Sequence, residues 1–373
     1  MLHEATEQQR HLGDSLQRYL RREHDFARRR RLANEGVGDP ELWRGLRELG
    51  LPGLLVPEQH GGLQAPLADL LHALQVLGPA LVLEPVLGSC LLATDLLASC
   101  GGEVAAHWLQ RLAQGAIASI AVFEPAAGFA IEQPRCQAHA EAGGWLLDGD
   151  KTLLLQPARA EVLLVAARCP DAQLAWFAVP AQAVGVRLRG YALLDGQPAA
   201  DLQLRQVRLA QPARLPGDAL AAARRLRDLW LAGLCAGAVG VLQACLDASV
   251  EYLRTRHQFG APLATQQVLR HRASAMWIEV EQARSLAWLA ARRFDTLRPD
   301  ERAELLAAAK ARVGSACRQV GQQSVQLHGG IGLTDELPLS HWFKHLTLVD
   351  QWLGHAALQV QRYAELAGEE DLR

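Results

Sequence analysis

The chain has 373 residues, enough for two or three domains, and 50% of its residues are hydrophobic while 21% are charged. This composition predicts a sizeable core and excludes a disordered or collagen-like chain. Lysine and arginine number 38 against 40 acidic residues, and the resulting formal charge of −2 argues against nucleic acid as the main partner, because phosphate binding needs a basic surface.

Residues 1–115 are predicted to be helical. Asp39-Pro40 is a helix-start signal that predicts a short helix ending near Leu49. A run of four arginines, residues 28–31, is interpreted as the solvated face of a helix. Gly101-Gly102 is interpreted as the end of the helical run. Helical spacing of apolar residues is found in two further segments, residues 65–77 and 87–97.

The pattern changes between residues 116 and 215. Short apolar runs separated by glycine-containing turns predict a small antiparallel β domain. The residues Asp148-Gly149-Asp150 are interpreted as a tight turn between two strands. The expected strands lie at residues 117–123, 145–147, 162–166 and 174–179.

Residues 216–373 carry only helical signals, and four long helices with short links predict an up-down bundle. The apolar stretch Leu229–Leu246 has Gln243 as its only polar residue. Alanine and glycine are weak drivers of membrane insertion, so this stretch is interpreted as a buried bundle helix, and no membrane span is predicted. The expected helices are 218–256, 264–294, 299–327 and 346–367.

The sequence therefore predicts an α+β multi-domain fold: an N-terminal α-helical domain (1–115), a middle small antiparallel β domain (116–215) and a C-terminal four-helix bundle (216–373). Seven scattered cysteines without a Cys-x-x-Cys pair predict free, buried thiols, a reducing compartment and no metal site. The polar N-terminus does not resemble a signal peptide, so a cytoplasmic location is expected.

The motifs for a serine nucleophile, a zinc protease and a P-loop are missing from the sequence. A polar constellation is found instead near the end of the first long bundle helix and of the third. Arginine, amides and exposed backbone N–H groups suit a pyrophosphate or a polar heterocycle, although the same residues also serve as caps and loop ties. The constellation consists of Arg256, Phe259, Gln267, Gln326, Gly329 and Gly330.

Two of these segments resemble the C-terminal signatures of the acyl-CoA dehydrogenase flavoproteins: Tyr252–Pro262 with Gln267, and Val325–Thr334 with Glu336 and Pro338. Weaker similarity is found at residues 50–53 and 56–63 and at Glu124-Pro125, and it runs over nearly the whole chain in the family's order.

This resemblance implies α,β-dehydrogenation of an acyl-CoA to a trans-2-enoyl-CoA in fatty acid metabolism, with non-covalent FAD and an electron acceptor flavoprotein. It also implies dimer-based assembly, with FAD held between two protomers. One protomer supplies the adenosine and pyrophosphate side through the six residues of the constellation, Arg256, Phe259, Gln267, Gln326, Gly329 and Gly330.

The other protomer would cradle the flavin ring, and there this chain departs from the family pattern. Phe123 replaces the threonine before Glu-Pro, and Ala126-Ala127-Gly128-Phe129 replaces a Gly-Ala-Gly-Ser run. Leu153-Leu154-Leu155 falls on the Trp-x-Thr that lines flavin N5. Leucine side chains cannot donate the hydrogen bonds expected there.

The catalytic base is also missing. Most members place a glutamate in Tyr-Glu-Gly-Thr, where this chain has Leu353, and a minority place it where this chain has Trp230. Asp350 and Asp228 lie nearby as candidate relocated bases, although a helix residue two or three positions away points in another direction.

These departures predict the base-lacking subunit of a heteromeric acyl-CoA dehydrogenase, in which a second family subunit carries the catalytic glutamate. Two alternatives remain open. One is an autonomous dehydrogenase of acyl-CoA or acyl-carrier substrates with a displaced base. The other is a structural subunit that binds no flavin.

Overall fold

The computed structural model describes residues 5–125 and 127–370. The chain folds into two compact units that interleave along the sequence. The first unit consists of Met1–Gln17, Leu71–Val82 and Leu231–Arg373, and the second consists of Arg18–Leu70 and Leu83–Trp230. The domain boundaries expected near residues 115 and 215 stay predictions.

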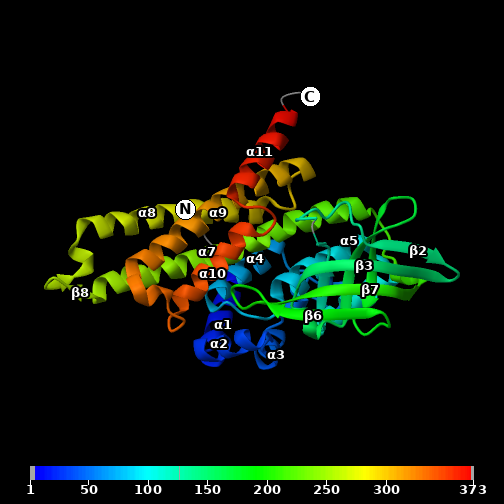
Figure 1. Ribbon diagram of the computed structural model, residues 1–373, viewed down its shortest axis with the longest axis horizontal. Helices are drawn as coiled ribbons and strands as arrows, with labels where there is room; N and C mark the ends of the chain where they lie inside the picture. Colours follow the sequence, from blue (N-terminus) through cyan, green and yellow to red (C-terminus); the bar gives the residue numbers. More distant parts are fainter. Residues whose placement is uncertain (1–4, 126, 371–373) are drawn as a thin grey trace. The chain divides into compact units, whose positions relative to one another are not determined.

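The first unit is a bundle of long helices, drawn from yellow-green to red in Figure 1. Helix α9 is its centre, because it packs against α8, α10 and α11. Pro299 stands at its first turn, and Arg298 forms a capping box with Glu301. The helices are α7 (Ala219–Thr255), α8 (Gln267–Arg293), α9 (Pro299–His328), α10 (Pro338–Gln351) and α11 (Ala356–Glu370).

The single helix predicted over residues 346–367 is wrong. Helix α10 ends at Gln351 and α11 begins at Ala356. Between them Leu353 has φ 58° and Gly354 has φ 101°, and left-handed residues cannot continue a right-handed helix. The apolar spacing continues through this break, which is why the sequence pattern missed it.

Helix α7 runs through both units. It is the one helix among the described residues that is long and apolar enough to cross a membrane. Of its most apolar window, 83% is buried inside the protein, as in the core helix of a folded domain. Its first part, up to Trp230, belongs to the second unit.

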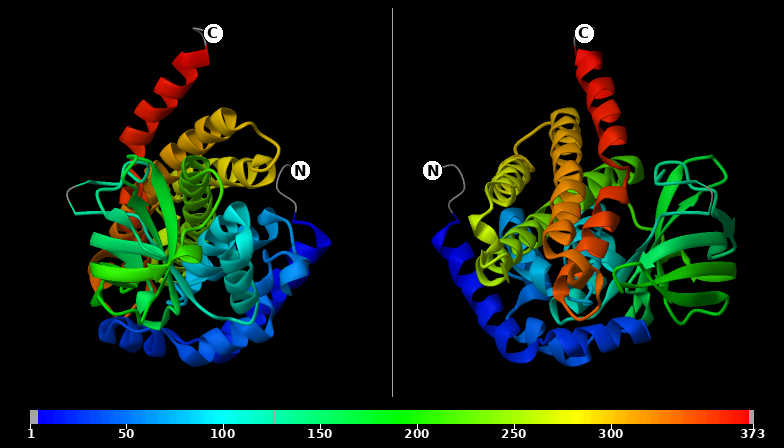
Figure 2. Two further views of the ribbon diagram at one scale, coloured as in Figure 1. Left: turned by 90° about the vertical axis from the view of Figure 1, so that its right-hand side faces the viewer. Right: turned by 60° about the vertical axis from the view of Figure 1, so that its left-hand side comes forward.

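The second unit contains a seven-stranded sheet, shown in green from two sides in Figure 2. The strand order is β1-β4-β2-β3-β7-β6, and β5 pairs with β4. The prediction of a purely antiparallel sheet is wrong, because β1 pairs with β4 in parallel and β2 meets β4 at one parallel position. The strands are β1 (Ala118–Ala121), β2 (Gln137–Glu141), β3 (Gly144–Leu155), β4 (Val162–Arg168), β5 (Leu174–Pro180), β6 (Val186–Ala192) and β7 (Pro198–Ala210).

The tight turn expected at residues 148–150 is a β-bulge. Strand β3 continues through Gly149, where its register with β7 shifts. Gly149 has φ 152°, and a Cβ there would lie 2.7 Å from the Cα of Cys136. A second register shift follows between Lys151 and Leu154, where Leu153 has φ 56°.

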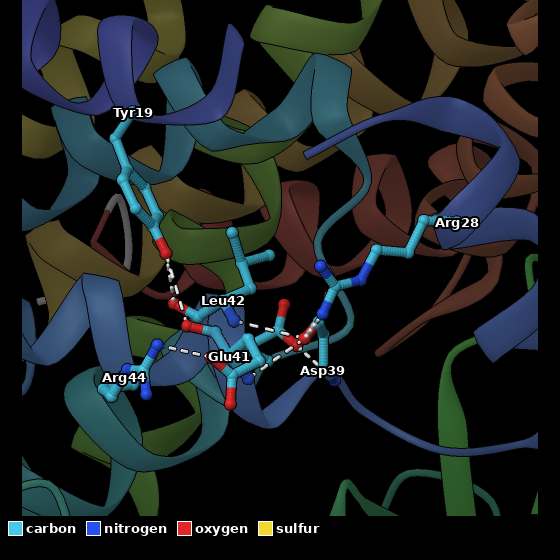
Figure 3. Close-up of polar contacts among 7 residues, drawn as sticks. Tyr19, Arg28, Asp39, Glu41, Leu42 and Arg44 are labelled. Carbon is cyan, nitrogen blue, oxygen red and sulfur yellow. Dashed lines mark hydrogen bonds and ion pairs between the residues drawn. The ribbon is translucent and has the colours of Figure 1, made fainter. Parts of the chain in front are cut away.

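Helices cover the remainder of the N-terminal part. The predicted start at Asp39-Pro40 is confirmed, because the Asp39 carboxylate accepts the backbone N–H groups of Glu41 and Leu42 (Figure 3). Gly102 begins a further helix instead of ending the run. The helices are α1 (Glu7–Glu23), α2 (Phe26–Glu35), α3 (Pro40–Glu48), α4 (Leu67–Leu77), a π-helix (Val86–Ala93), α5 (Thr94–Cys100) and α6 (Gly102–Ala113).

The arginine run is only in part a solvated face. Arg28 pairs with Asp39 at 2.7 Å, as Figure 3 shows. Arg29 is 1% exposed, and its guanidinium donates to the backbone oxygen of the buried Asp195 at 2.5 Å. Helix α2 therefore uses Arg29 to hold the turn between β6 and β7 within the second unit.

Candidate functional site

A short hairpin carries the first group of predicted site residues. Helix α7 ends at Thr255, and β8 (His257–Gln258) pairs with β9 (Ala261–Pro262) beside the label β8 in Figure 1. Phe259 and Gly260 form its tip with φ values of 55° and 80°, as a two-residue turn of this twist requires. Phe259 is 93% exposed. A phenylalanine held this far into solvent fits a surface that another molecule covers.

Arg256 stands at the base of the hairpin. Its backbone is engaged, since its N–H donates to Tyr252 and its carbonyl accepts from Leu263. Its side chain is exposed, and no ion pair within the described ranges involves its guanidinium. Gln267, also exposed, begins α8 just after the hairpin. The arginine is thus free to bind an anionic group.

The second group lies where α9 ends. Gln326 is exposed in the last turn, and Gly329 ends the helix with φ 66°. Gly329 and Gly330 are exposed, and a Cβ at either position would have no neighbouring atom within 4 Å. The backbone there can therefore be approached closely by a ligand.

One contact that the sequence did not reveal joins the two groups. The ring of Tyr252, near the end of α7, stacks on the buried ring of His328, the last residue of α9, with centroids 4.4 Å apart. His328 Nδ1 lies 2.8 Å from the carbonyl oxygen of Ser324, and burial lowers the pKa of its imidazole. A neutral histidine here packs the hairpin end of α7 against the glycine end of α9.

The Glu-Pro motif is built on a buried ion pair in the second unit. The Glu124 carboxylate lies 2.6 Å from Lys151 Nζ, and their side chains are 4% and 0% exposed. It also accepts the backbone N–H groups of Arg135 at 2.7 Å and Cys136 at 2.9 Å. Burial opposes ionisation, but the lysine and these hydrogen bonds outweigh it and lower the pKa of Glu124. This carboxylate is a structural anion and not a proton acceptor.

The positions expected to lie near the flavin ring or to hold the base carry apolar side chains. Phe123 and Trp230 are each 1% exposed, and their ring centroids lie 4.9 Å apart. Leu153 sits in the second bulge of β3, where its N–H donates to the hydroxyl of Tyr191 at 3.2 Å. Ala126 lies outside the described residues. The ring side therefore does not fit a flavin as it stands, whereas the side formed by Arg256 and the paired glycines fits a pyrophosphate.

Leu353, at the position of the family's usual base, is 7% exposed and belongs to a tightly held loop. Its carbonyl accepts from Gln359 Nε2 at 2.6 Å. Lys310, which is fully buried, donates to the carbonyls of Asp350 and Gly354 at 3.0 Å each, and burial lowers the pKa of this amine. These hydrogen bonds hold the loop in place, but residue 353 is a leucine and cannot accept a proton.

The two candidate relocated bases are both interior groups. Asp350 is 5% exposed, and its carboxylate accepts the backbone N–H of Ala356 at 3.1 Å, so it caps α11. Arg318 lies 3.9 Å from its other oxygen. Asp228 is 3% exposed on α7. The geometry gives Asp350 a capping role, and it remains an untested candidate base.

Comparisons with known proteins give one consistent result. The chain matches the family models for the N-terminal domain (residues 6–116) and the C-terminal domain (residues 232–367) of acyl-CoA dehydrogenase. It is similar to the acyl-CoA dehydrogenase FadE12 of Mycobacterium tuberculosis, with 29% identity over 322 residues and 79% of each chain covered.

Two solved structures are similar over nearly the whole chain. The ChsE4-ChsE5 complex from Mycobacterium tuberculosis superposes with a TM-score of 0.90 at 25% identity, covering 98% of both chains. The Tcur3481-Tcur3483 steroid ACAD variant superposes with a TM-score of 0.89 at 27% identity, covering 98% of this chain and 99% of the other.

Proposed function

We propose, since this chain belongs to the acyl-CoA dehydrogenase family, that it is the base-lacking subunit of a heteromeric acyl-CoA dehydrogenase. Members of the family are FAD-dependent flavoproteins that oxidise acyl-CoA. The ChsE4-ChsE5 complex, which joins two different chains, is a precedent among its structural relatives.

The observation that carries this proposal is the identity of the residues at both base positions. The reaction needs a carboxylate to take the α-proton of the acyl group while a hydride leaves the β-carbon; FAD, when bound, supplies the hydride acceptor. Leu353 and Trp230 hold these positions, and neither accepts a proton. Loss of a general base costs about 10²–10⁴-fold in rate.

In this proposal the chain contributes binding instead of chemistry. Arg256 contacts the pyrophosphate of an FAD whose ring lies on the partner subunit, and Gln326 with the backbone of Gly329 and Gly330 lines the same channel. The partner carries the catalytic glutamate and binds the acyl-CoA, and an electron acceptor flavoprotein removes the electrons. The seven free, buried cysteines support a cytoplasmic location.

The test is dye-linked acyl-CoA oxidation by the purified single chain. The expected result is no turnover with short-, medium- or long-chain acyl-CoA, because Leu353 and Trp230, at the two base positions, cannot accept a proton. The matched control is Asp350→Asn, which removes the one nearby carboxylate of the Leu353 loop. Turnover by the single chain would overturn the proposal, and its loss in an Asp350→Asn variant that circular dichroism shows to be folded would make Asp350 the base.

A further inference from the structure

Three aromatic rings meet in the second unit and form what we call the aromatic cluster: Phe123, Phe129 and Trp230. Phe123 follows β1, and Trp230 lies on α7. Their centroids are 4.9 Å apart with planes inclined by 42°, and Phe129 meets Phe123 edge to face with centroids 5.2 Å apart. Phe129 is half-buried, whereas the other two rings are 1% exposed.

The helix that carries Trp230 is firmly anchored in this unit. Trp176 of β5 donates its indole N–H to the carbonyl of Ala219 at 3.1 Å, where α7 begins. Arg225 forms a bidentate ion pair with Asp95 of α5, with its shortest contact at 2.7 Å. Trp230 therefore presents its ring to Phe123 from a fixed support.

The loop that carries Phe129 is held at both ends. The Glu124 carboxylate at its start binds the backbone N–H of Arg135 at its end, which closes the loop on itself. Glu132 forms a bidentate ion pair with Arg227 at 2.6 and 2.7 Å. Arg227 lies three residues before Trp230 on α7, so both side chains leave the same side of the helix. The ion pair thus keeps Phe129 on the cluster.

The three rings stand where the family resemblance expects a threonine, a serine and, in a minority of members, a glutamate. We infer that the aromatic cluster seals this chain's own flavin-ring side, so that the chain offers FAD only its adenosine and pyrophosphate side. Large rings fill space that small hydroxyl side chains would leave open. The inference rests on the proposed function and extends it, since it names the residues that keep a flavin ring out of this subunit.

A direct consequence concerns ligand preference. The full-length chain then binds only the adenosine and pyrophosphate part of FAD. ADP contains the same part. We therefore expect FAD and ADP to bind the wild-type chain with affinities within about threefold of each other, which is less than 1 kcal/mol. The ring of FAD stays in solvent, so its fluorescence does not fall below that of free FAD.

The experiment opens the cluster. The double variant Phe123→Thr, Trp230→Ala is titrated with FAD and with ADP, with flavin fluorescence and calorimetry as readouts. We expect this variant to bind FAD about tenfold or more tighter than ADP and to quench the ring fluorescence, because the ring gains an apolar cavity. Phe294→Thr is the matched control, since Phe294 is as deeply buried but lies in the bundle, and it should keep the wild-type ratio of FAD affinity to ADP affinity.

A milder variant guards against loss of folding. Phe129→Ser changes a half-buried loop residue and should shift the FAD preference in the same direction. Wild-type chain that quenches the flavin ring and prefers FAD tenfold over ADP overturns the sealing. So does a folded opened variant, checked by circular dichroism, that gains no preference for FAD. Ring binding by the wild type without acyl-CoA turnover refutes the sealing alone, whereas turnover refutes the proposed function.

Discussion

The surface around Arg256 and the interior around Phe123 are built in opposite ways. Around Arg256, the guanidinium and the tip ring of Phe259 are exposed, and the glycines at 329 and 330 leave the backbone open. Around Phe123, aromatic rings pack against each other, and the buried Glu124 and Lys151 form an ion pair. The region around Arg256 has polar side chains that form no hydrogen bonds or ion pairs among the described residues. In the region around Phe123, aromatic rings fill the space in which a ligand would lie. Which residues serve another molecule can therefore be read from what they leave unsatisfied.

The largest expected loss of stability comes from a substitution in the interior around Phe123. Glu124→Gln removes the charge opposite Lys151 in a fully buried pair, and it weakens the acceptors of two backbone N–H groups. We expect a loss of about 3–5 kcal/mol in the free energy of unfolding, because an uncompensated buried ammonium remains. Urea denaturation measures it. A loss below about 1 kcal/mol, as for a surface pair, would contradict this description of the interior.

The next effect is a pH dependence within the same unit. The pKa of Glu84 is raised from 4.5 to about 7, and burial is the largest cause. The Asp39 N–H, which donates to the Glu84 carboxylate, and the charge of Arg159 oppose this rise, whereas the Asp39 carboxylate contributes to it. The folded state therefore holds this proton more tightly than the unfolded state. The free energy of unfolding should fall as pH rises from 4.5 to 7, by at most about 3 kcal/mol.

Glu84→Gln isolates this contribution. The variant should match the wild type near pH 5 and exceed it by about 1–3 kcal/mol at pH 8, because the glutamine carries no charge to bury. Thermal denaturation at both pH values compares the two proteins. Parallel pH profiles for wild type and variant would show that Glu84 titrates normally.

The exposed region should respond in binding and not in folding. Arg256→Ala removes a charge-assisted hydrogen bond to pyrophosphate, which is worth about 1.5–3 kcal/mol or roughly 10- to 150-fold in FAD affinity. Its stability should change by less than about 0.5 kcal/mol, because the side chain contacts little. Bound flavin and melting temperature are measured on the assembly purified from its host. Unchanged flavin content would show that Arg256 does not contribute to FAD binding and serves only the structure of the hairpin.

The smallest expected effect on stability compares two glycines. Gly330→Ala meets no atom within 4 Å and should leave the free energy of unfolding within about 0.5 kcal/mol of wild type. Gly149→Ala, in the bulge of β3, would place its methyl against the backbone of Cys136 and should cost about 1–3 kcal/mol. Equal stability losses in urea for both variants would remove the distinction between the open and the packed region.

The sequence predicted the parts of this molecule that depend on local signals. Asp39-Pro40 predicts a capped helix start because one side chain and one ring suffice to produce it. The break at Leu353 could not be predicted, since an apolar residue in left-handed geometry is held there by Lys310 and Gln359 from elsewhere in the chain. Gly149 was expected in a turn, but only the pairing of β3 with β7 makes it a bulge.

The candidate site divides in the same way. Residue types and a family resemblance together identified the motif residues around Arg256 and Gly329, whereas the contact of Phe123 with Trp230 joins residues far apart in the sequence. Only three of the 38 basic residues are lysines, which the sequence alone suggested to be a coding bias, yet two of them, Lys151 and Lys310, are at most 1% exposed. At these two interior positions a compact ammonium donates to acceptors of the chain itself.

We propose that this chain supplies half of a flavin site to a partner subunit, and the flavin-to-protein ratio of the native assembly measures this. The tagged chain is purified with its partner from the host, and flavin absorbance is compared with the amount of each subunit. We predict a heterotetramer of two different subunits with one FAD per heterodimer, because each of this chain's ring sides is sealed. A homotetramer of this chain with one FAD per chain would show that its own ring side binds flavin and that no partner subunit is needed.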